Sequence, residues 1–431
     1  MLQPSPAPGQ PFLTRYRWVI CALIFAEITI NYVDRMVFGL LAPELQKIFT
    51  WSNSDYTNIA FWFEIGYAIG LAFVGRFLDR VGTRWGLALS LIAWCIASMM
   101  HAGMSTIAGF CLARLLLGVS ESGAYPGATK ATAEWFPRRE RALVAGIFNS
   151  GSNVGAIIAP LAVPWLFINY GWEWAFVATG GLGLLWVGFW LTLYREPAHH
   201  PRVSKAELAH ILSDPADTIL ELIPWRRILA TRQAWAFIMG KFFTDAIWRW
   251  NLYLLPLFFS QHFNLNIKQF GPPFLVIYLM ADVGSIGGGW LSSHLLKRGW
   301  SLNAARKTAM LICVLGVLPV TLTTQVSSLW VAIFLVGLAT ACHQGWSSNL
   351  YTSISDMFPK HAVATVAGIG GTAGALGAIL LLKLTSMLFD SSASNSQTYT
   401  VLFIIAGAAY LAALACFHLL VPRMEPVKAA S

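Results

Sequence analysis

Charged side chains interrupt several stretches of this sequence that are otherwise apolar. Asp34 and Arg35 stand side by side within INYVDRMVFG, and Arg114 and Glu121 stand seven residues apart within CLARLLLGVSESG. A charge at the centre of a membrane helix costs about 2.5–3.5 kcal/mol on insertion scales. Residues that keep a charge in such a place are therefore candidates for binding a ligand or moving a proton.

The two arginines and the two carboxylates predict different chemistry. A guanidinium is permanently charged and presents a planar fork to a carboxylate, so Arg35 and Arg114 are candidates for binding an organic anion. The charge of a buried carboxyl depends on whether a ligand occupies the neighbouring arginine, so Asp34 and Glu121 are candidates for coupling proton movement to anion movement. The alternative is that the four side chains form fixed ion pairs between two helices.

A second set of charges lies in two other apolar stretches. Lys241, Asp245 and Arg249 recur at intervals of four within GKFFTDAIWRWNLYLLP and so share one helix face. Lys241 and Asp245 fit a simple intrahelical ion pair. Glu64 in FWFEIGYAIG is predicted at a depth similar to Arg249, and two interpretations stay open: Arg249 pairs with Glu64 in a gate, or it binds a second carboxylate of the ligand.

Further polar and aromatic side chains in the apolar stretches are candidates for contacting a hydroxylated ligand. A tryptophan can stack on a sugar ring, and hydroxyl and amide groups can hydrogen-bond to ligand hydroxyls. Each of them fits an ordinary packing contact between helices as well. These candidates are Tyr32, Tyr67, Asn149, Ser152, Trp248, Trp346, Ser347 and Thr372.

Composition predicts the elements that must position these side chains. The chain has 431 residues, of which 56% are hydrophobic and only 11% charged, as is typical of an integral membrane protein. Apolar runs of about 20 residues, the length that crosses the hydrocarbon core, recur along it. The twelve predicted membrane helices are 18–40, 56–77, 84–101, 105–131, 141–168, 173–194, 233–260, 269–293, 307–323, 328–352, 361–388 and 399–421.

The net charge is +9. The positions of the basic residues follow membrane topology, so this charge does not indicate nucleic-acid binding. Lys and Arg concentrate before the first helix, after the last helix and in every second loop, as the positive-inside rule expects of cytoplasmic segments. Both termini are therefore predicted to be cytoplasmic. The six cysteines all lie in the apolar runs, and no two of them form a close pair such as CxxC. This pattern is typical of cysteines that serve as small buried apolar residues.

An internal repeat divides the twelve helices into two sets of six. EWFPRRERALVAGI at 134–147 aligns without a gap with DMFPKHAVATVAGI at 356–369, an offset of 222 residues. Both copies fall between the fourth and fifth helix of their half, which indicates two parallel repeats. The predicted organisation is a cytoplasmic tail at 1–17, a six-helix bundle at 18–194, a cytoplasmic linker at 195–232, a second six-helix bundle at 233–421 and a cytoplasmic tail at 422–431.

The loop after the second predicted helix combines glycines and charges at a specific spacing. In GRFLDRVGTRWG the glycines allow close approach and a sharp turn, while the charged side chains can hydrogen-bond at a cytoplasmic helix end and lock one conformation. The alternative is an ordinary basic loop. The residues concerned are Gly75, Asp79, Arg80, Gly82 and Arg84.

GRFLDRVGTR resembles the loop signature of the major facilitator superfamily. INYVDR, EWFPRRERALVAGIFNSGSNVGAIIAP and KFFTDAIW resemble the bacterial anion:cation symporters, most closely their hexuronate transporter branch. The resemblance implies the all-α membrane fold of that superfamily, with two pseudo-symmetric six-helix bundles, and proton-coupled uptake of a sugar acid by alternating access. It also implies that Asp34 and Glu121 carry protons and that Arg35 and Arg114 coordinate the anion.

Three positions depart from the pattern of the family that the chain resembles. Glu64 stands where an amide is usual, Arg249 where an aromatic residue is usual, and Ala124 where an asparagine is common. The chain thus gains one acid and one base, which can neutralise each other. An aldonate, a sugar diacid or another organic anion stays open as the alternative substrate.

Other functional classes have little support in the sequence. An enzyme would need a catalytic constellation, and the sequence contains no HExxH, no GxSxG and no close cluster of His and Asp. A channel would not need the duplicated loops, and a receptor would not need charges in both halves. We expect no cofactor and no metal. The expected partners are a small organic anion, protons and membrane lipid, without nucleic acid, for a monomer in a bacterial cytoplasmic (inner) membrane.

Overall fold

The described residues form long helices joined by short turns. The structure, a computed structural model, describes residues 15–213, 225–358, 360–391 and 394–427, and within these ranges it contains no β-strand. Parts of three predicted segments lie outside the described residues, namely 1–14 of the first tail, 214–224 of the linker and 428–431 of the last tail.

The N-terminal group of helices is built around α1, which packs on α7 and α8, while α3 packs on α5 and α4 packs on α8. Local sequence sets several of the helix ends. Ser52 and Asp55 form a capping box at the start of α3, and glycines with positive φ end α3 and α7. The helices are α1 (Arg17–Leu40), α2 (Ala42–Phe49), α3 (Asn53–Val81), α4 (Thr83–Met100), α5 (Ile107–Glu121), α6 (Ala124–Trp135), α7 (Arg138–Tyr170) and α8 (Trp172–Leu193).

The C-terminal group repeats this kind of packing. α11 packs on α15 and α16, and α14 packs on α12 and α13. The helices are α11 (Arg232–Phe263), α12 (Gly271–Lys297), α13 (Leu302–Val317), α14 (Leu329–Met357), α15 (Lys360–Ser391) and α16 (Asn395–Leu420). Two short helices, α9 (Lys205–Ile211) and α10 (Trp225–Leu229), lie between the groups in sequence.

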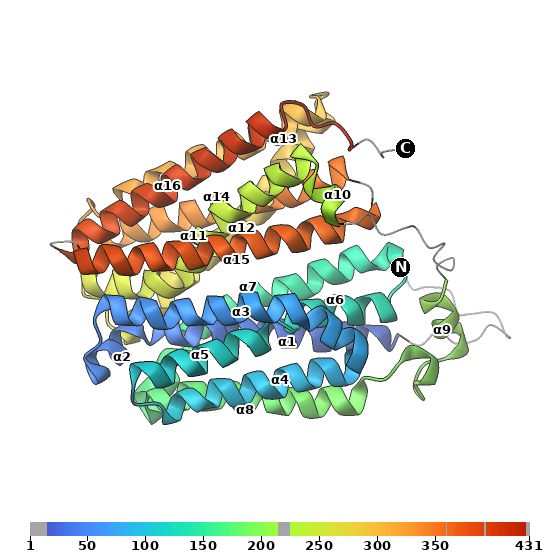
Figure 1. The fold of residues 1–431 in the computed structure, drawn as a ribbon, viewed down its shortest axis with the longest axis horizontal. Helices are drawn as coiled ribbons and strands as arrows, with labels where there is room; N and C mark the ends of the chain where they lie inside the picture. The colour runs from blue at the N-terminus through green and yellow to red at the C-terminus, as the bar shows by residue number, and fades with distance from the viewer. Residues whose placement is uncertain (1–14, 214–224, 359, 392–393, 428–431) are drawn as a thin grey trace, which may run out of the picture.

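The two groups lie side by side with their helices roughly along the long axis of the molecule (Figure 1). The N-terminal group, blue to green, lies below the C-terminal group, and α9 and α10 lie at the end where the N and C marks stand. The short helix α2 lies at the opposite end, which we call the α2 end. The bounds of the two bundles given in the sequence analysis stay a prediction.

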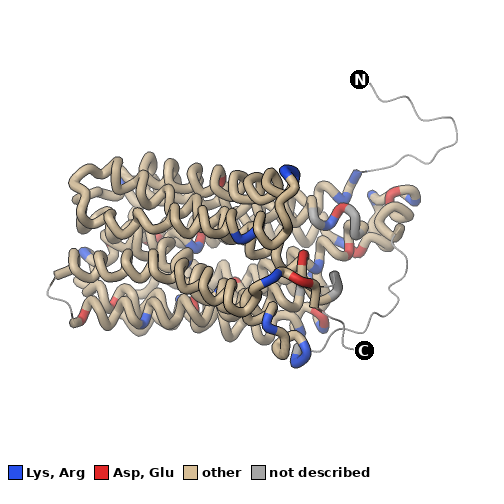
Figure 2. The backbone as a smooth tube through the Cα atoms, turned by 90° about the horizontal axis from the view of Figure 1, so that it is seen from above, with Lys and Arg blue, Asp and Glu red and all other residues tan. Residues whose placement is uncertain are grey.

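Among the described residues, ten segments are long and apolar enough to cross a membrane by length and composition alone. α1 has 24 residues and carries Asp34 and Arg35, and α11 has 32 residues and carries Lys241, Asp245 and Arg249. Their charges lower their apolar character, which explains why they are not among the ten. Figure 2 shows most Lys and Arg toward the end marked N and C. Twelve spans and the cytoplasmic side of both termini stay predictions.

The described hydrogen bonds that join the two groups gather in the half of the molecule that carries α2. Ser54 on α3 lies 2.6 Å from the hydroxyl of Ser386 on α15. Gln261 on α11 donates to Asn53 Oδ1 at 2.7 Å. Gly39 on α1 lies so close to α11 that a Cβ there would be 2.3 Å from the carbonyl oxygen of Leu252. The groups are therefore held together at the α2 end.

The first described part of the linker, which ends at residue 213, is fixed to the opposite end of the N-terminal group. Arg17 Nε lies 3.1 Å from Glu140, and His210 of α9 lies 2.8 Å from the same carboxylate. Burial alone would raise the pKa of Glu140, but the hydrogen bonds from His210 and Arg17 outweigh it and lower that pKa. The contribution of Glu140 to docking is therefore present above its ordinary pKa and is lost as the pH falls through the lowered value.

We expect Gly39→Ala to open the α2 end. The added methyl would meet the backbone carbonyl of Leu252, which cannot turn aside. Overpacking of this kind costs about 1–3 kcal/mol, enough to shift a two-state equilibrium about 5–150-fold. Distances between spin labels at exposed Lys47 and Asp390 would measure the shift, with longer distances expected in the variant.

Gly181→Ala on α8 is the matched control, because a Cβ at Gly181 meets nothing within 4 Å. The control should keep the distances of the parent protein. If Gly39→Ala also keeps them, the close approach of α1 and α11 does not hold this end closed.

Candidate functional site

Arg35 and Glu121 form a buried ion pair within the N-terminal group. Arg35 Nε donates to Glu121 Oε2 at 2.6 Å, and both side chains are more than nine-tenths buried. The second oxygen of Glu121 and the Nη2 of Arg35 have no hydrogen-bond partner among the described residues. The guanidinium lies 4.6 Å from the ring centre of Tyr67 and 5.9 Å from that of Tyr32. Arg35 thus keeps an unused donor beside a neutralising carboxylate.

Arg114 is fully buried, and none of its three nitrogens has a hydrogen-bond partner in the described part of the chain. Three rings surround the guanidinium: Phe63 at 4.4 Å, Phe38 at 4.7 Å and Tyr253 at 5.5 Å from the ring centres. Aromatic faces attract a cation but do not satisfy its N–H donors. Arg114 is therefore a buried positive charge whose fork is available to a carboxylate.

Asp34 is turned into the interior of the N-terminal group. Its carboxylate accepts hydrogen bonds from Trp94 Nε1 at 2.5 Å, from Ser98 at 2.7 Å and from Thr179 at 2.7 Å. Arg114 lies within electrostatic range. Adjacent residues on a helix point in different directions, so Asp34 and Arg35 do not share partners. The sequence left open that fixed ion pairs join the helices that carry these four charges, which are α1 and α5. Among the described contacts, the pair between Arg35 and Glu121 is present.

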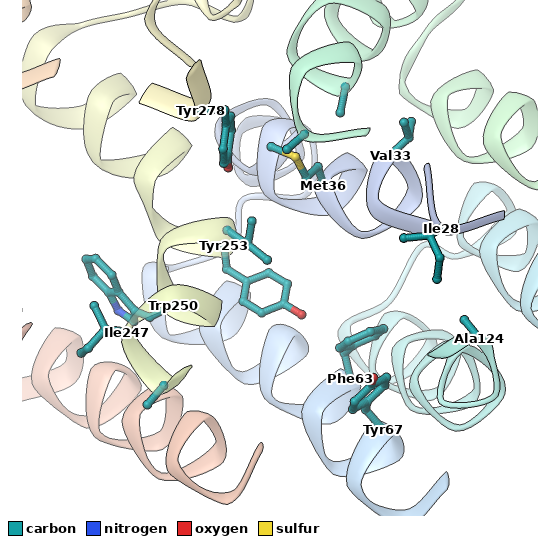
Figure 3. Packing of buried hydrophobic residues seen from close by; sticks show 14 of the residues in the cluster. Ile28, Val33, Met36, Phe63, Tyr67, Ala124, Ile247, Trp250, Tyr253 and Tyr278 are labelled. Atoms are coloured by element: carbon teal, nitrogen blue, oxygen red, sulfur yellow. The ribbon is translucent and has the colours of Figure 1, made fainter. Parts of the chain in front are cut away.

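Glu64 and Arg249 join the two groups. Arg249 Nη1 donates to Glu64 Oε2 at 2.8 Å, and the hydroxyl of Tyr253 donates to Glu64 Oε1 at 3.2 Å. Tyr56 donates to the carbonyl oxygen of Tyr253 at 2.9 Å. Figure 3 shows Tyr253 reaching from α11 toward Phe63 on α3. The acid and the base that depart from the family pattern thus pair with each other in this conformation.

The remaining charged and aromatic candidates on α11 have partners in the C-terminal group. Lys241 Nζ lies 2.5 Å from Asp245, as the simple intrahelical pair predicts. The Trp248 ring stacks on that of His343 at 4.9 Å and 7°. His343 Nδ1 in turn lies 2.6 Å from the hydroxyl of Tyr410. One face of Trp248 is therefore covered by His343.

The weaker candidates differ in exposure. Asn149 and Thr372 are exposed, whereas Ser152 and Ser347 are half-buried. Ser152 donates to the carbonyl oxygen of Asn149 at 2.6 Å, and Thr372 donates to its own helix. Trp346 is fully buried, and its indole N–H has no partner among the described residues. Their roles in ligand binding stay predictions.

The signature loop makes its described contacts within the N-terminal group. Asp79 lies 2.7 Å from Lys130 on α6, and Arg84 donates to the carbonyl oxygen of Leu191 on α8 at 2.5 Å. Gly82 has φ of +82°, a value that glycine adopts without strain, where α3 turns into α4. Gly75 and Arg80 are exposed. The loop is thus tied to α6 and α8 in this conformation.

Sequence reasoning missed Tyr253 and the three donors to Asp34. Tyr253 carries a usable signal, because it follows Arg249 by one helical turn and so shares its face. Trp94 and Ser98 also share a face, but nothing in the sequence links them to Asp34. Thr179 lies 145 residues from Asp34, and this pairing becomes visible only in the fold.

The fold consists of two groups of membrane-length helices, and both groups contribute charges to the interior. These features define a multi-pass membrane transporter. The family model described as Major Facilitator Superfamily matches residues 24–382. The chain belongs to that superfamily, and it is not an enzyme.

Known proteins support the resemblance to sugar-acid carriers. The hexuronate transporter of Escherichia coli (strain K12) is 28% identical over 381 residues, which are 87% of this chain and 88% of that protein. The galacturonate transporter of Dickeya chrysanthemi is 31% identical over 280 residues, which are 64% of this chain and 81% of that protein. A solved D-xylose-proton symporter superimposes with a TM-score of 0.74 at 15% identity, covering 96% of this chain and all of that one, and it shows the shared fold.

Neutralising either member of the Glu64–Arg249 pair should destabilise the protein. Glu64→Gln or Arg249→Gln leaves a buried charge without its partner, which costs about 3–5 kcal/mol when burial is complete. The double variant removes both charges and should recover most of that loss. Thermal unfolding of the purified protein would measure the three differences.

The comparison separates the two interpretations of Arg249. Recovery in the double variant supports a pair between the groups. If every Arg249 variant instead loses transport of sugar diacids alone, with stability unchanged, Arg249 serves the ligand.

Proposed function

We propose that this chain is a proton-coupled symporter that imports a sugar acid, most specifically a hexuronate, by alternating access. It works as a monomer of twelve membrane helices in the bacterial cytoplasmic membrane, with both termini in the cytoplasm. The names of its relatives support the substrate class. The unpaired buried charge of Arg114 is the observation that carries the proposal.

Charge balance favours an anion with one carboxylate. Arg35 is balanced by Glu121, and Arg249 is balanced by Glu64. Arg114 has neither an ion-pair partner nor a hydrogen-bond partner among the described residues, at a position where an unpaired charge is costly. A single carboxylate bound to its fork satisfies the donors and neutralises the charge. The unused Nη2 of Arg35 and the ring of Tyr67 are available to the hydroxylated part of the ligand.

The same balance couples a proton to the anion. When Asp34 is ionised, its charge offsets that of Arg114, and the site has no net charge for an anion to neutralise. When Asp34 takes up a proton, Arg114 is left positive and can bind the carboxylate. The proton and the anion therefore favour each other, which is the linkage that symport requires. Glu121 contributes in a similar way, because its protonation would release Arg35 to the ligand.

The closed α2 end supports the alternating-access part of the proposal. Hydrogen bonds and the Glu64–Arg249 pair hold the two groups together on that side. With the predicted topology, this is the conformation whose external side is closed. The signature loop from Gly75 to Arg84, bonded here to α6 and α8, would be free to engage the C-terminal group when the carrier reorients.

A sugar diacid is the second candidate. Arg249 is the observation in its favour, since it is one cation more than the family pattern has. The pairing of Arg249 with Glu64 weakens this alternative, because a second carboxylate would have to displace Glu64.

Arg114→Ala should abolish binding of the sugar acid in a protein that still inserts and purifies. Each hydrogen bond to a charged group contributes about 1.5–3 kcal/mol, so the loss of two should weaken binding at least about 100-fold. Arg114→Lys should restore little, because the planar fork is lost. Calorimetric titration with D-galacturonate, an aldonate and an aldarate would measure the affinities.

Arg202→Ala is the control, since Arg202 is an exposed arginine of the linker. It should bind like the parent protein. Retention of full affinity by Arg114→Ala would overturn the assignment of the anion site, and preference for the aldarate would favour the second candidate.

The proton step predicts that Asp34→Asn and Glu121→Gln impair gradient-driven uptake more than substrate exchange. Exchange returns a loaded carrier and does not need an empty carrier to lose its proton. Both activities can be measured in proteoliposomes with labelled galacturonate. If both variants accumulate substrate against its gradient like the parent protein, neither carboxyl couples the proton.

A further inference from the structure

Besides Asp34, which is hydrogen-bonded, α1 carries a second buried carboxyl, that of Glu27, which has no partner among the described residues. Glu27 is fully buried, and neither of its carboxyl oxygens has a hydrogen-bond partner in the described chain. Asn31, one turn further along α1, is also fully buried with both amide atoms unpartnered. Four unsatisfied polar atoms on two residues one helical turn apart are unusual, because buried polar groups are almost always hydrogen-bonded.

Glu27 and Asn31 lie on the same face of α1 as Asp34. At 100° per residue the three positions fall within about 60° of one another around the helix axis. Glu27 and Asp34 are seven residues apart, or about 10 Å along the axis, with Asn31 between them. This face points into the N-terminal group, where Asp34 meets Trp94 and Thr179. We call the three residues the α1 polar row.

The donors are distributed unequally along the α1 polar row. Asp34 accepts three hydrogen bonds, which stabilise its ionised form. Glu27 has no donor, and no described ion pair from α6, α7 or α8, the helices packed beside α1 in the N-terminal group, reaches it. An unpaired carboxylate is too costly to keep for long in an apolar interior, so Glu27 takes up a proton readily and is ionised only transiently.

A neutral Glu27 has hydrogen-bonding groups that suit the Asn31 amide. The acid has an O–H donor that an ionised carboxylate lacks, and Asn31 Oδ1 one turn away can accept it. The amide N–H of Asn31 can donate to the acid carbonyl in return. One proton on Glu27 thus makes the hydrogen-bonding groups of the two side chains complementary, although the two do not bond to each other in this conformation.

We propose that Glu27 is a second proton-binding site of the carrier, which exchanges protons with Asp34 along the α1 polar row. The inference rests on the proposed function, in which Asp34 takes up the coupled proton. After Glu27 has released its own proton to water at the α9 end, the O–H of Asp34 gives its proton to water, and water gives a proton to a carboxylate oxygen of Glu27. Asp34 is then ionised and Glu27 neutral, so the total charge of the row is unchanged.

The position of Glu27 gives the transfer a direction. It lies nearer than Asp34 to the start of α1, at the end that carries α9. With the predicted topology this is the cytoplasmic side. The proton therefore leaves through the interior of the N-terminal group, on a route separate from that of the anion beside Arg114.

Glu27→Gln tests the proposal, because glutamine keeps the shape and fills the same space without binding a proton. The full-length variant in proteoliposomes would be compared with the parent protein using D-galacturonate and an entrapped pH-sensitive dye. With a pH difference of about one unit, coupling of one proton gives about tenfold accumulation. We expect Glu27→Gln to lose this accumulation and to release fewer protons per galacturonate, while exchange stays within about twofold.

Glu196→Gln is the matched control, since Glu196 is an exposed carboxyl outside the membrane-length helices. The control should keep both accumulation and proton release. If the parent protein releases protons and Glu27→Gln releases as many per galacturonate, Glu27 has only a structural role and the inference is wrong, while the proposed function stands. If the parent protein releases no protons, the proposed coupling fails and this inference fails with it.

A measurement on the parent protein covers the case in which Glu27→Gln does not fold. Dicyclohexylcarbodiimide is apolar and adds to carboxyl groups that carry a proton, so it should modify the buried Glu27 and leave the exposed Glu196 unmodified. Peptide mass spectrometry would locate the adduct. Modification of Glu27 that also abolishes proton release supports the proposal, and unimpaired proton release by protein fully modified at Glu27 overturns it.

Discussion

The cost of holding a charge away from water decides most of what is specific about this molecule. Arg35 and Arg249 are each paired with a carboxylate, and the pair that contains Arg249 links the two groups of helices. Arg114 is surrounded by rings that attract it without meeting its donors. A site of this kind is poised for a ligand that brings a carboxylate, because binding relieves a penalty that the empty protein bears.

The rigid frame around the site comes from close contacts between helices. In an apolar surrounding, helices associate through small residues and through polar side chains that hydrogen-bond across the interface. Gly39 and Ser54 serve these two purposes at the α2 end, where the groups meet. The frame therefore does not depend on the buried charges alone, and those charges are free to respond to a ligand or a proton.

Much of this arrangement was visible in the sequence, because a charge inside an apolar run is rare enough to stand out. Arg35, Arg114 and Glu121 could be singled out in this way, and the depth estimate that matched Glu64 with Arg249 anticipated an ion pair that the structure contains. The donors to Asp34 could not be predicted, since Thr179 comes from a helix far along the chain. Glu27 shows the same signal as Asp34, but its lack of partners is a property of the packing and not of the pattern.

The two ion pairs have a consequence for the energetics of transport across an energised membrane. In the proposed mechanism each pair moves as a neutral unit, and an ionised Asp34 balances Arg114 when the site is empty. In the loaded carrier a protonated Asp34 leaves Arg114 to be balanced by the substrate carboxylate. Both forms then cross the bilayer without net charge in the site, so the membrane voltage, worth about 2.3 kcal/mol per charge at 100 mV, does little work on either one. Uptake would be driven by the difference in pH and would be electrically silent.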